Sequence, residues 1–440
     1  MYEGLKGFRD FYPGEQSARR EVTDAIEGAA ARYGFREVAT PALERTEMYV
    51  DKSGEGIVEE LYAFEDRGGR KVSLTPELTP TVARMVVAKG QELSKPIKWM
   101  STRPFWRYEQ VQQGRFREFY QTNIDVFGSS APEADAEVLA VAADALTDLG
   151  LTGDDFEFRV SHRDVLGGLV RALADDPEAV DVEAAIRAVD KRAKVDDGEY
   201  FGLLSDAGLD RATAREFDDL ITGVDDPADL DAVAEAGGED VEAAVSNLRS
   251  VLAAADDFGA GEFCEISLTT ARGLDYYTGV VFECFDSTGE VSRSVFGGGR
   301  YDDLIESFGG QPTPAVGVAP GHATLKLLCQ RAGVWPDEEL STDYYVLSVG
   351  DTRAKAAEIA RDLRALGDDV VVETDVSDRS FGSQLGYADS INAETVVVVG
   401  ERDLANGEVT VKDMASGDET TAPVAEFPPD SSLPTYEDYE

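Results

Sequence analysis

Two strand-like segments joined by a short polar loop impose the strongest constraint on the fold of this chain. The segments are 105–108 and 119–127, and the loop 110–114 reads Gln-Val-Gln-Gln-Gly. Aromatic and β-branched residues on both sides of a glycine-containing loop are typical of an antiparallel hairpin. Because side chains alternate between the two faces of a strand, residues two apart share a face. The residues expected to share a face are Arg107 with Glu109 on the first strand, and Phe119, Gln121, Asn123 and Asp125 on the second.

The side chains on these faces suit a bound nucleotide. A guanidinium binds a phosphate in bidentate fashion, an aromatic ring stacks on a base, and a carboxylate accepts a hydrogen bond from an exocyclic amine. The alternative is a solvated hairpin whose charged residues form cross-strand ion pairs. The hairpin alone leaves both interpretations open.

An excess of acidic residues limits the conditions under which such a chain is compact. The 440 residues include 87 acidic and 41 basic side chains, for a net charge of −46, yet 42% of residues are apolar and favour folded cores over disorder. Molar salt shortens the Debye length to about 3 Å and screens this self-repulsion. We therefore expect a protein of a salt-rich cytoplasm, in which only local basic clusters bind phosphate.

Length and composition also exclude several classes of protein. The length favours two or three domains, and no apolar run approaches the roughly 20 residues of a membrane helix. The N-terminus carries no recognisable secretory or transit signal, so a cytoplasmic location is expected. The three cysteines are far apart, and the two histidines, His162 and His322, are interpreted as structural. Disulfide frameworks and zinc clusters are therefore not expected, and no side chain is assigned to a metal.

Periodicity along the chain predicts a mixed α/β architecture. An amphipathic helix is expected at 15–32, followed by a strand at 35–40 that ends before Pro41. The acidic, Ala-rich middle of the chain predicts helices, and alternating strands and helices near the C-terminus predict a small α/β domain with a mostly parallel sheet. The expected parts are a mixed α/β region (1–165), a helical insertion (166–256), resumed strands (257–331), a linker (332–342), the small domain (343–427) and a flexible acidic tail (428–440).

Four further segments carry recognisable motifs. Residues 271–279 read Ala-Arg-Gly-Leu-Asp-Tyr-Tyr-Thr-Gly, and residues 298–304 read Gly-Gly-Arg-Tyr-Asp-Asp-Leu. The opening segment 4–13 and the segment Leu-Thr-Pro-Glu-Leu-Thr at 74–79 complete the set. Together with the hairpin 103–125, these segments resemble the histidyl-tRNA synthetases, a family of class II aminoacyl-tRNA synthetases, over nearly the whole chain. The acidic composition adds the expectation of a source among halophilic archaea.

The resemblance implies an α+β catalytic domain with an antiparallel sheet of the class II synthetase type, formed by residues 1–165 and 257–331. It also implies that residues 343–427 form an α/β anticodon-binding domain. Members of the family usually form homodimers, and the region before Pro41 resembles the motif that forms their interface. The partners implied are tRNA(His), L-histidine, ATP and a second copy of the chain, with no membrane.

The activity implied is that of a histidine–tRNA ligase, which activates L-histidine with ATP, releases pyrophosphate and transfers the histidyl group to tRNA(His). This chemistry needs charge stabilisation more than proton transfer. By position in the matching motifs, Arg107 and Arg272 are the expected catalytic residues. ATP binding is expected from Arg107 together with Glu109 at the adenine amine, Phe119 stacked on adenine and Arg115 at the terminal phosphates. Mg²⁺ is expected with ATP, held mainly through the phosphates.

The resemblance also implies a pocket for histidine. Asp125 and Tyr277 match positions that bracket the imidazole nitrogens, and a neutral imidazole offers one donor and one acceptor for them. Glu77, Thr79 and Gln121 match positions that hold the α-amino group. The full expected histidine-binding set is Glu77, Thr79, Arg107, Gln121, Asp125, Arg272, Tyr276 and Tyr277.

One stretch departs from the class pattern. Residues 317–326 match motif 3, but Thr324 stands where the class has an arginine that contacts ATP. Either Arg115, Arg300 or Lys326 covers the missing charge, or ATP binding is weakened.

In the C-terminal domain, residues 378–389 resemble the loop and helix of the family's anticodon-binding domain. Single-stranded bases are read by stacking and by hydrogen bonds to their edges. The expected tRNA contacts are Arg379, Phe381, Gln384 and Tyr387. The alternative is that most of these side chains only pack the domain's own helix.

A competing interpretation is a catalytically silent relative, such as the regulatory subunit of ATP phosphoribosyltransferase or a sensor of histidine or tRNA. The altered motif 3 favours that alternative. Intact Arg107, Gln121 and Arg272, together with an apparent anticodon-binding domain, favour the ligase. A plain RNA-binding protein does not explain the segments 271–279 and 298–304, which match the two histidine-specific signatures of the family.

Overall fold

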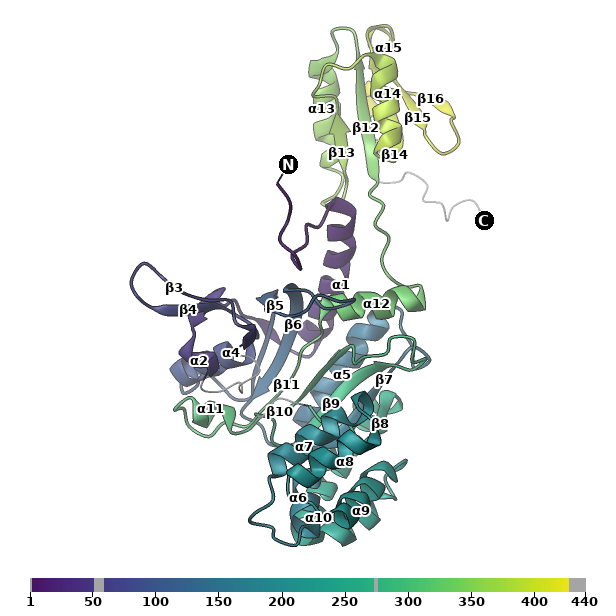
Figure 1. Cartoon of the computed structure of the whole chain (residues 1–440). Coiled ribbons are helices and arrows are strands. Elements are labelled where there is room, and N and C mark those ends of the chain that lie inside the picture. The colour runs from purple at the N-terminus through teal and green to yellow at the C-terminus, as the bar shows by residue number, and fades with distance from the viewer. Residues whose placement is uncertain (1, 51–58, 273–275, 427–440) are drawn as a thin grey trace. The chain divides into compact units, whose positions relative to one another are not determined.

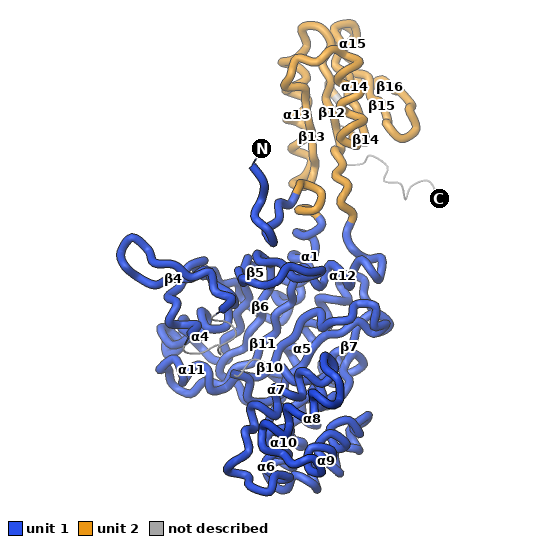
Figure 2. The backbone as a smooth tube through the Cα atoms, in the orientation of Figure 1, with its two compact units in different colours: residues 1–11, 18–336 blue, residues 12–17, 337–440 orange. Residues whose placement is uncertain are grey.

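The computed structural model describes residues 2–50, 59–272 and 276–426, which fall into two compact units (Figures 1 and 2). The first unit comprises residues 1–11 and 18–336, and the second comprises residues 12–17 and 337–440. The predicted flexible tail 428–440 lies outside the described residues, as does the centre of the 271–279 motif. The finer domain boundaries expected within these units stay predictions.

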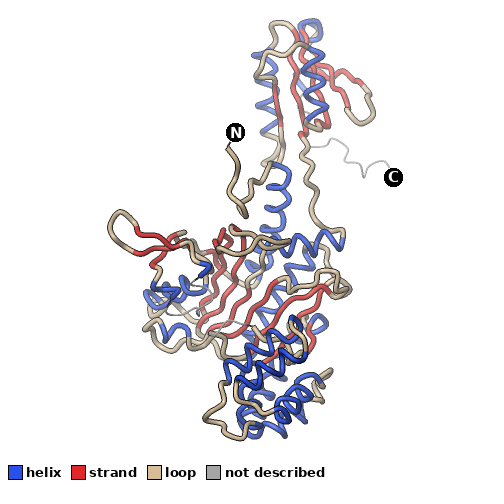
Figure 3. The backbone as a smooth tube through the Cα atoms, in the orientation of Figure 1, coloured by secondary structure: helices blue, strands red, loops and turns tan. Residues whose placement is uncertain are grey.

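An eight-stranded sheet forms the centre of the first unit (Figure 3). Its order is β1-β5-β6-β11-β10-β9-β7-β8; the six inner strands run antiparallel to one another, and the edge strands β1 and β8 pair in parallel. The strands are β1 (Arg36–Glu37), β5 (Ile97–Trp106), β6 (Glu118–Phe127), β7 (Phe156–His162), β8 (Cys264–Ile266), β9 (Val280–Asp286), β10 (Phe296–Arg300) and β11 (Ala315–Val318). The expected catalytic fold with an antiparallel sheet is confirmed.

The predicted hairpin is formed by β5 and β6, with Phe105 opposite Phe119. Strand β5 is continuous through Pro104, although proline lacks an N–H group. The N–H of Trp106, two residues on, points away from β6 to the carbonyl oxygen of Thr75 at 3.1 Å, so the nitrogen of Pro104 lies on the same outer side. Strand β1 covers that side only at Trp99 and Met100, and no ladder bond is lost at the proline.

Helices and a small three-stranded sheet accompany the central sheet. They are α1 (Pro13–Arg32), α2 (Glu47–Val50), α4 (Thr79–Lys89), α5 (Pro132–Asp148), α11 (Leu304–Ser307) and α12 (His322–Ala332), with strands β2 (Leu43–Arg45), β3 (Ala63–Glu65) and β4 (Lys71–Leu74). Helix α5 packs on β6 and β11, and α12 packs on β6. The helix expected at 15–32 is α1. The strand expected at 35–40 is shorter, because only β1 pairs with β5 before the chain reaches Pro41.

The acidic middle of the chain is helical, as predicted, and its helices gather at one end of this unit beside α5 and β7 (Figure 1). They are α6 (Arg163–Leu173), α7 (Val182–Lys191), α8 (Asp197–Asp206), α9 (Arg211–Thr222) and α10 (Leu230–Asp257). Asp181, Asp196 and Asp210 cap three of them by accepting hydrogen bonds from backbone N–H groups. His162 caps α6 through Nδ1, and its Nε2 lies 3.2 Å from Asn247 Oδ1, which fits its structural interpretation.

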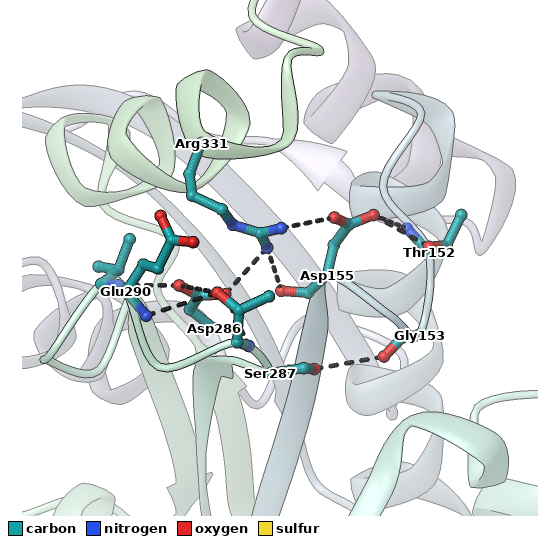
Figure 4. A network of polar contacts seen from close by, with 9 residues as sticks. Thr152, Gly153, Asp155, Asp286, Ser287, Glu290 and Arg331 are labelled. Atoms are coloured by element: carbon teal, nitrogen blue, oxygen red, sulfur yellow. Dashed lines mark hydrogen bonds and ion pairs between the residues drawn. The ribbon is translucent and has the colours of Figure 1, made fainter.

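A guanidinium fixes α12 against the sheet. Arg331 Nη1 donates to Asp155 Oδ1 at 2.8 Å, and Nη2 lies 2.9 Å from Asp286 Oδ1 (Figure 4). Asp155 immediately precedes β7 and Asp286 ends β9. Because α12 begins in the stretch 317–326 that matches motif 3, this network fixes the position of the helix that carries this motif.

The second unit has a five-stranded sheet in the order β13-β12-β14-β15-β16. Strands β13, β12 and β14 are parallel, as predicted, whereas β15 and β16 add an antiparallel hairpin that the sequence analysis did not predict. Helices α13 and α14 pack against alternate residues of β12 and so cover opposite faces. The elements are β12 (Thr342–Val349), α13 (Arg353–Arg364), β13 (Val372–Thr374), α14 (Phe381–Ser390), β14 (Ala393–Gly400), α15 (Glu401–Ala405), β15 (Glu408–Asp413) and β16 (Glu419–Pro423).

Within residues 2–50, 59–272 and 276–426, no helix combines the length and the apolar character needed to cross a bilayer.

A buried ion pair joins β10 to α5. Arg300 Nε donates to Asp135 Oδ1 at 3.0 Å, and Nη2 donates to Oδ2; the exposed fractions of the two side chains are 8% and 1%. We expect Arg300→Met to lower the free energy of unfolding by about 3–5 kcal/mol, because it leaves a buried carboxylate without its partner. Urea unfolding in molar KCl measures this change.

The double variant Arg300→Met/Asp135→Leu is the control, because it removes both charges and should recover most of the stability. Equal losses in the single and double variants would show that packing, not charge, accounts for the effect.

Candidate active site

Two adjoining cavities lie at the centre of the first unit. The larger has a volume of about 560 Å³ and the smaller about 50 Å³. Arg107, Gln121, Arg272, Gly297 and Ala319 line both of them. The two arginines expected to be catalytic therefore come from a loop next to the β5–β6 hairpin and from the segment before β9, and they meet where the cavities join.

The structure gathers the sequence-predicted residues around these cavities. The residues expected to bind ATP all line the larger cavity, namely Arg107, Glu109, Arg115 and Phe119. The eight expected histidine-binding residues all line the smaller one, namely Glu77, Thr79, Arg107, Gln121, Asp125, Arg272, Tyr276 and Tyr277. Strand alternation predicted that Phe119, Gln121 and Asp125 of β6 converge. Arg107 and Glu109 were expected on the first strand of the hairpin, and this was wrong, because β5 ends at Trp106 and both residues lie in the loop beyond it.

Arg107 is held at the rim by the backbone. Its Nε donates to the carbonyl oxygen of Pro76 at 3.0 Å, and its own N–H donates to the carbonyl oxygen of Arg117 at 3.0 Å. The guanidinium carbon lies 5.5 Å from the ring centroid of Phe119. An aromatic face and a cation are therefore presented together, which suits a planar base bearing phosphates.

Arg272 lies against the glycine-rich strand β10. Its Nη1 donates to Glu283 Oε1 at 3.1 Å. A Cβ atom at Gly297 would lie 1.8 Å from that same Nη1, so any other residue would displace the guanidinium. Arg272 thus requires a glycine at position 297, whereas a Cβ at Gly298 would lie 2.2 Å from the carbonyl oxygen of Gly317.

The larger cavity is positively charged although the protein is strongly acidic. Seven basic and three acidic side chains line it: Arg107, Arg115, Arg159, Arg192, Lys194, Arg272 and Arg293, against Glu109, Asp190 and Glu283. The chain as a whole carries −46. The cavity is therefore the kind of local basic cluster that the charge analysis required for phosphate binding.

Asp125 is the central polar group of the smaller cavity. Its Oδ1 accepts a hydrogen bond from the Tyr301 hydroxyl at 2.5 Å. Burial raises the pKa of Asp125 to about 7, although this hydrogen bond acts in the opposite direction. A Cβ at Gly317 would lie 2.1 Å from Asp125 Oδ1, so this glycine leaves the carboxyl group its space.

Other side chains order the walls of the same cavity. The Tyr276 hydroxyl donates to Glu77 Oε2 at 3.3 Å, and Gln121 Nε2 donates to the carbonyl oxygen of Ala319 at 2.9 Å. The acceptor groups are thus oriented around a space that fits only a small polar group.

Several lining residues were not assigned to the site from sequence. Tyr301 belongs to the 298–304 motif. Asn123 shares a strand face with Gln121 and Asp125, so the period-two spacing could have identified it as a lining residue. Asn123 is buried, and its Oδ1 has no hydrogen-bond partner among the described residues. Glu283 and Arg293 also line the larger cavity, and only the fold brings them there.

The motif 3 position is occupied by a hydroxyl. Thr324 Oγ1 donates to the carbonyl oxygens of Val295 and Gly321. Of the three candidates to cover the missing charge, Arg115 lines the larger cavity. Arg300 is committed to its buried ion pair, and the ammonium of Lys326 lies 4.7 Å from the ring centroid of Trp335; neither lines this cavity.

His322 fits its structural interpretation. It is buried at the start of α12, and its Nε2 lies 3.0 Å from Thr122 Oγ1. Burial lowers the pKa of His322 to about 3, so the ring is neutral at physiological pH.

The expected tRNA contacts in the second unit divide into two kinds. Phe381 is 47% exposed, and Arg379 and Tyr387 stack with 4.0 Å between the guanidinium carbon and the ring centroid. Gln384 is buried, and its Nε2 donates to the carbonyl oxygens of Ser348 and Arg379. The first three present aromatic and cationic surface, whereas Gln384 holds the loop to β12.

An antiparallel sheet beside a cationic cavity that is large enough for a nucleotide and is lined by Arg107 and Arg272 matches the catalytic domain of a class II aminoacyl-tRNA synthetase. The family model described as Histidyl-tRNA synthetase matches residues 7–325, and that described as Anticodon binding domain matches residues 343–429. A histidine–tRNA ligase of the halophilic archaeon Halorubrum lacusprofundi is 90% identical, and one of Natronomonas pharaonis is 74% identical, each over 100% of both chains. The chain belongs to the histidyl-tRNA synthetase family.

Solved structures support the fold. A histidyl-tRNA synthetase from Nostoc superposes with a TM-score of 0.82 at 24% identity, covering 96% of this chain and 97% of that one. Because the sequence identity is low, this superposition shows that the two proteins share a fold and shows nothing more.

The raised pKa of Asp125 predicts a pH-dependent cost in stability. The native state holds this proton up to about pH 7, whereas the unfolded chain releases it near 3.8, so the stability falls as pH rises between these values. At about 1.36 kcal/mol per pKa unit, the cost is on the order of 4 kcal/mol. We therefore expect Asp125→Asn, which still accepts from Tyr301, to gain stability relative to the wild type between pH 4 and 7.

Urea unfolding across this pH range measures the difference. Asp10→Asn removes an exposed carboxyl group and is the control. A constant difference between Asp125→Asn and the wild type would contradict the prediction.

Proposed function

We propose that this chain is an ATP-dependent histidine–tRNA ligase that activates L-histidine and transfers it to tRNA(His). The observation that carries the proposal is the placement of Arg107 and Arg272 at the junction of the two cavities. A nucleotide in the larger cavity and an amino acid in the smaller one would meet at that junction. The two reacting groups, a phosphate and a carboxylate, are both anionic and need the same cations.

The first step joins histidine to the α-phosphate. A carboxylate oxygen of histidine attacks the α-phosphorus of ATP, the bond from that phosphorus to pyrophosphate breaks, and histidyl-adenylate remains. Arg107 and Arg272 reduce the repulsion between the two anions and stabilise the charge that develops in the transition state. In the second step a ribose hydroxyl at the 3′ end of the tRNA attacks the acyl carbon and AMP leaves.

The smaller cavity selects the amino acid. Asp125 and Tyr277 face the imidazole, and Glu77, Thr79 and Gln121 hold the α-ammonium group. An amino acid without matching donors and acceptors would leave Asp125 buried and unpaired on the ligand side, which costs several kcal/mol.

Mg²⁺ accompanies ATP in this proposal and would supply further charge neutralisation on the phosphates. Glu283, beside Arg272 in the larger cavity, is the carboxylate that would hold it together with the phosphate oxygens. Burial raises the pKa of Glu283 while Arg272 opposes this, so the carboxylate depends on nearby cations for its charge.

The proposed assembly is a cytoplasmic homodimer that works in high salt. The net charge of −46 supports the salt requirement. The second unit would read the anticodon of tRNA(His) through Arg379, Phe381 and Tyr387, with Gln384 as their support.

A catalytically silent relative is not favoured. Such a protein has no need for both arginines, for a cationic cavity large enough for a nucleotide and for an anticodon-binding domain in one chain. The altered motif 3 remains as the feature that the ligase must compensate.

Exchange between ATP and labelled pyrophosphate, run in molar KCl with each amino acid in turn, tests the function. We expect exchange with histidine alone in the wild type. Arg272→Gln should lower the exchange rate by about 10²–10³-fold, as expected when a donor to the transition state is lost. Folded protein that exchanges with no amino acid would contradict the proposal, and unchanged exchange in Arg272→Gln would remove this residue from the mechanism.

The anticodon assignment is tested separately. Phe381→Ala should raise the KM for tRNA(His) about tenfold by removing a stacking surface, while histidine-dependent exchange stays unchanged. Val371→Ala removes an exposed apolar group from the same unit and is the control. An unchanged KM in Phe381→Ala would exclude stacking at this position.

A further inference from the structure

Because Thr324 replaces the motif 3 arginine, the larger cavity lacks one positive charge of the class pattern. Thr324 directs its hydroxyl to backbone carbonyl oxygens and offers no charge. Of the charges considered above, only Arg115 lines the cavity, and its Nε lies 2.7 Å from Glu109 Oε2. A triphosphate would therefore receive less positive charge from these elements than the class pattern supplies.

A second guanidinium reaches the same place from another element. Arg293 belongs to the loop between β9 and β10, and its Nη1 donates to the carbonyl oxygen of Gln113 at 3.3 Å. A Cβ at Gly114 would lie 3.3 Å from Thr324 Cγ2 and 3.9 Å from Arg293 Nη1. The guanidinium of Arg293 is thus close to the side chain that replaces the class arginine.

The charge environment of Arg293 differs from that of its neighbours. Each of the other six basic side chains that line the cavity has a carboxylate within 4.0 Å. Within the described residues, no ion pair joins Arg293 to a carboxylate. Burial and the nearby charge of Arg115 lower the pKa of Arg293, and the charge of Glu109 acts in the opposite direction without forming an ion pair with it.

We propose that Arg293 binds the terminal phosphates of ATP together with Arg115, and so supplies from the β9–β10 loop the charge that motif 3 lacks. The proposal rests on the ligase function above. A polyphosphate is the ligand whose chemistry fits, because two adjacent guanidinium groups repel each other until an anion with several oxygens lies between them. Arg293 is then a binding residue for ATP and makes no contact with histidine, since it lines only the larger cavity.

The test compares Arg293→Gln, Arg293→Lys and the wild type in histidine-dependent exchange in molar KCl. Arg293→Gln should raise the KM for ATP roughly 10- to 100-fold, as expected for a lost charge-assisted hydrogen bond, with an unchanged KM for histidine. Arg293→Lys should recover part of the loss because it keeps the charge but not the fork of donors. Arg20→Gln removes one positive charge from an exposed face of α1 and is the control for net charge.

Titration of each protein with Mg·ATP in the absence of histidine measures binding independently of turnover. A weaker affinity in Arg293→Gln, with a thermal midpoint equal to that of the wild type, supports the proposal. An unchanged affinity for ATP overturns it, as does an equal rise in the KM for histidine, which indicates a structural role. If the wild type exchanges with no amino acid, the proposed function is wrong, and the titration still decides whether Arg293 binds ATP.

Discussion

The concentration of guanidinium groups around one cavity is the constraint on which the rest of this structure depends. In a chain that carries −46, seven basic side chains line a cavity of about 560 Å³. Bringing cations together costs free energy unless carboxylates or backbone carbonyls hold them, and here both are used. Glu283 holds Arg272, the carbonyl oxygen of Pro76 holds Arg107, and the carbonyl oxygen of Gln113 holds Arg293. The cavity is thereby preorganised for an anion.

The glycines and the buried ion pairs serve this arrangement. Gly297 and Gly317 give Arg272 and Asp125 the space that a side chain would take, so β10 and β11 leave room for these two side chains. Arg300 and Arg331 do not reach the larger cavity; they fasten β10 to α5 and α12 to the ends of β7 and β9. Two kinds of arginine therefore coexist: those that fix the scaffold through buried carboxylates, and those that remain available for phosphate.

The separation in sequence between two interacting residues decides whether their contact could be predicted. Strand alternation and local motifs predicted that Gln121 and Asp125 share a face and that Arg272 belongs with Tyr276 and Tyr277, because these relations lie within a few residues. The bond between Tyr301 and Asp125 spans 176 residues and that between Arg300 and Asp135 spans 165, so no local pattern contains them. The β15–β16 hairpin was missed, and the strand expected at 35–40 is shorter in the structure, because pairing partners, not propensity, decide where a strand begins and ends. The burial of Gln384 follows from the face of α14 that packs on β12, which sequence alone did not define.

The acidic surface and the cationic cavity respond differently to salt, which makes them compatible. Molar salt screens exposed charges over about 3 Å, whereas groups removed from solvent interact at a lower effective dielectric constant and are screened less. The surface can therefore become strongly acidic without weakening the contacts that Arg107 and Arg272 make inside the cavity. Binding that depends on counterion release loses strength in the same salt, so the proposed contacts of tRNA with Phe381 and with the stacked pair of Arg379 and Tyr387 would gain importance relative to phosphate contacts. A partner that is bound on the surface must then be recognised by shape and stacking, while a substrate enclosed in the cavity is still recognised by charge.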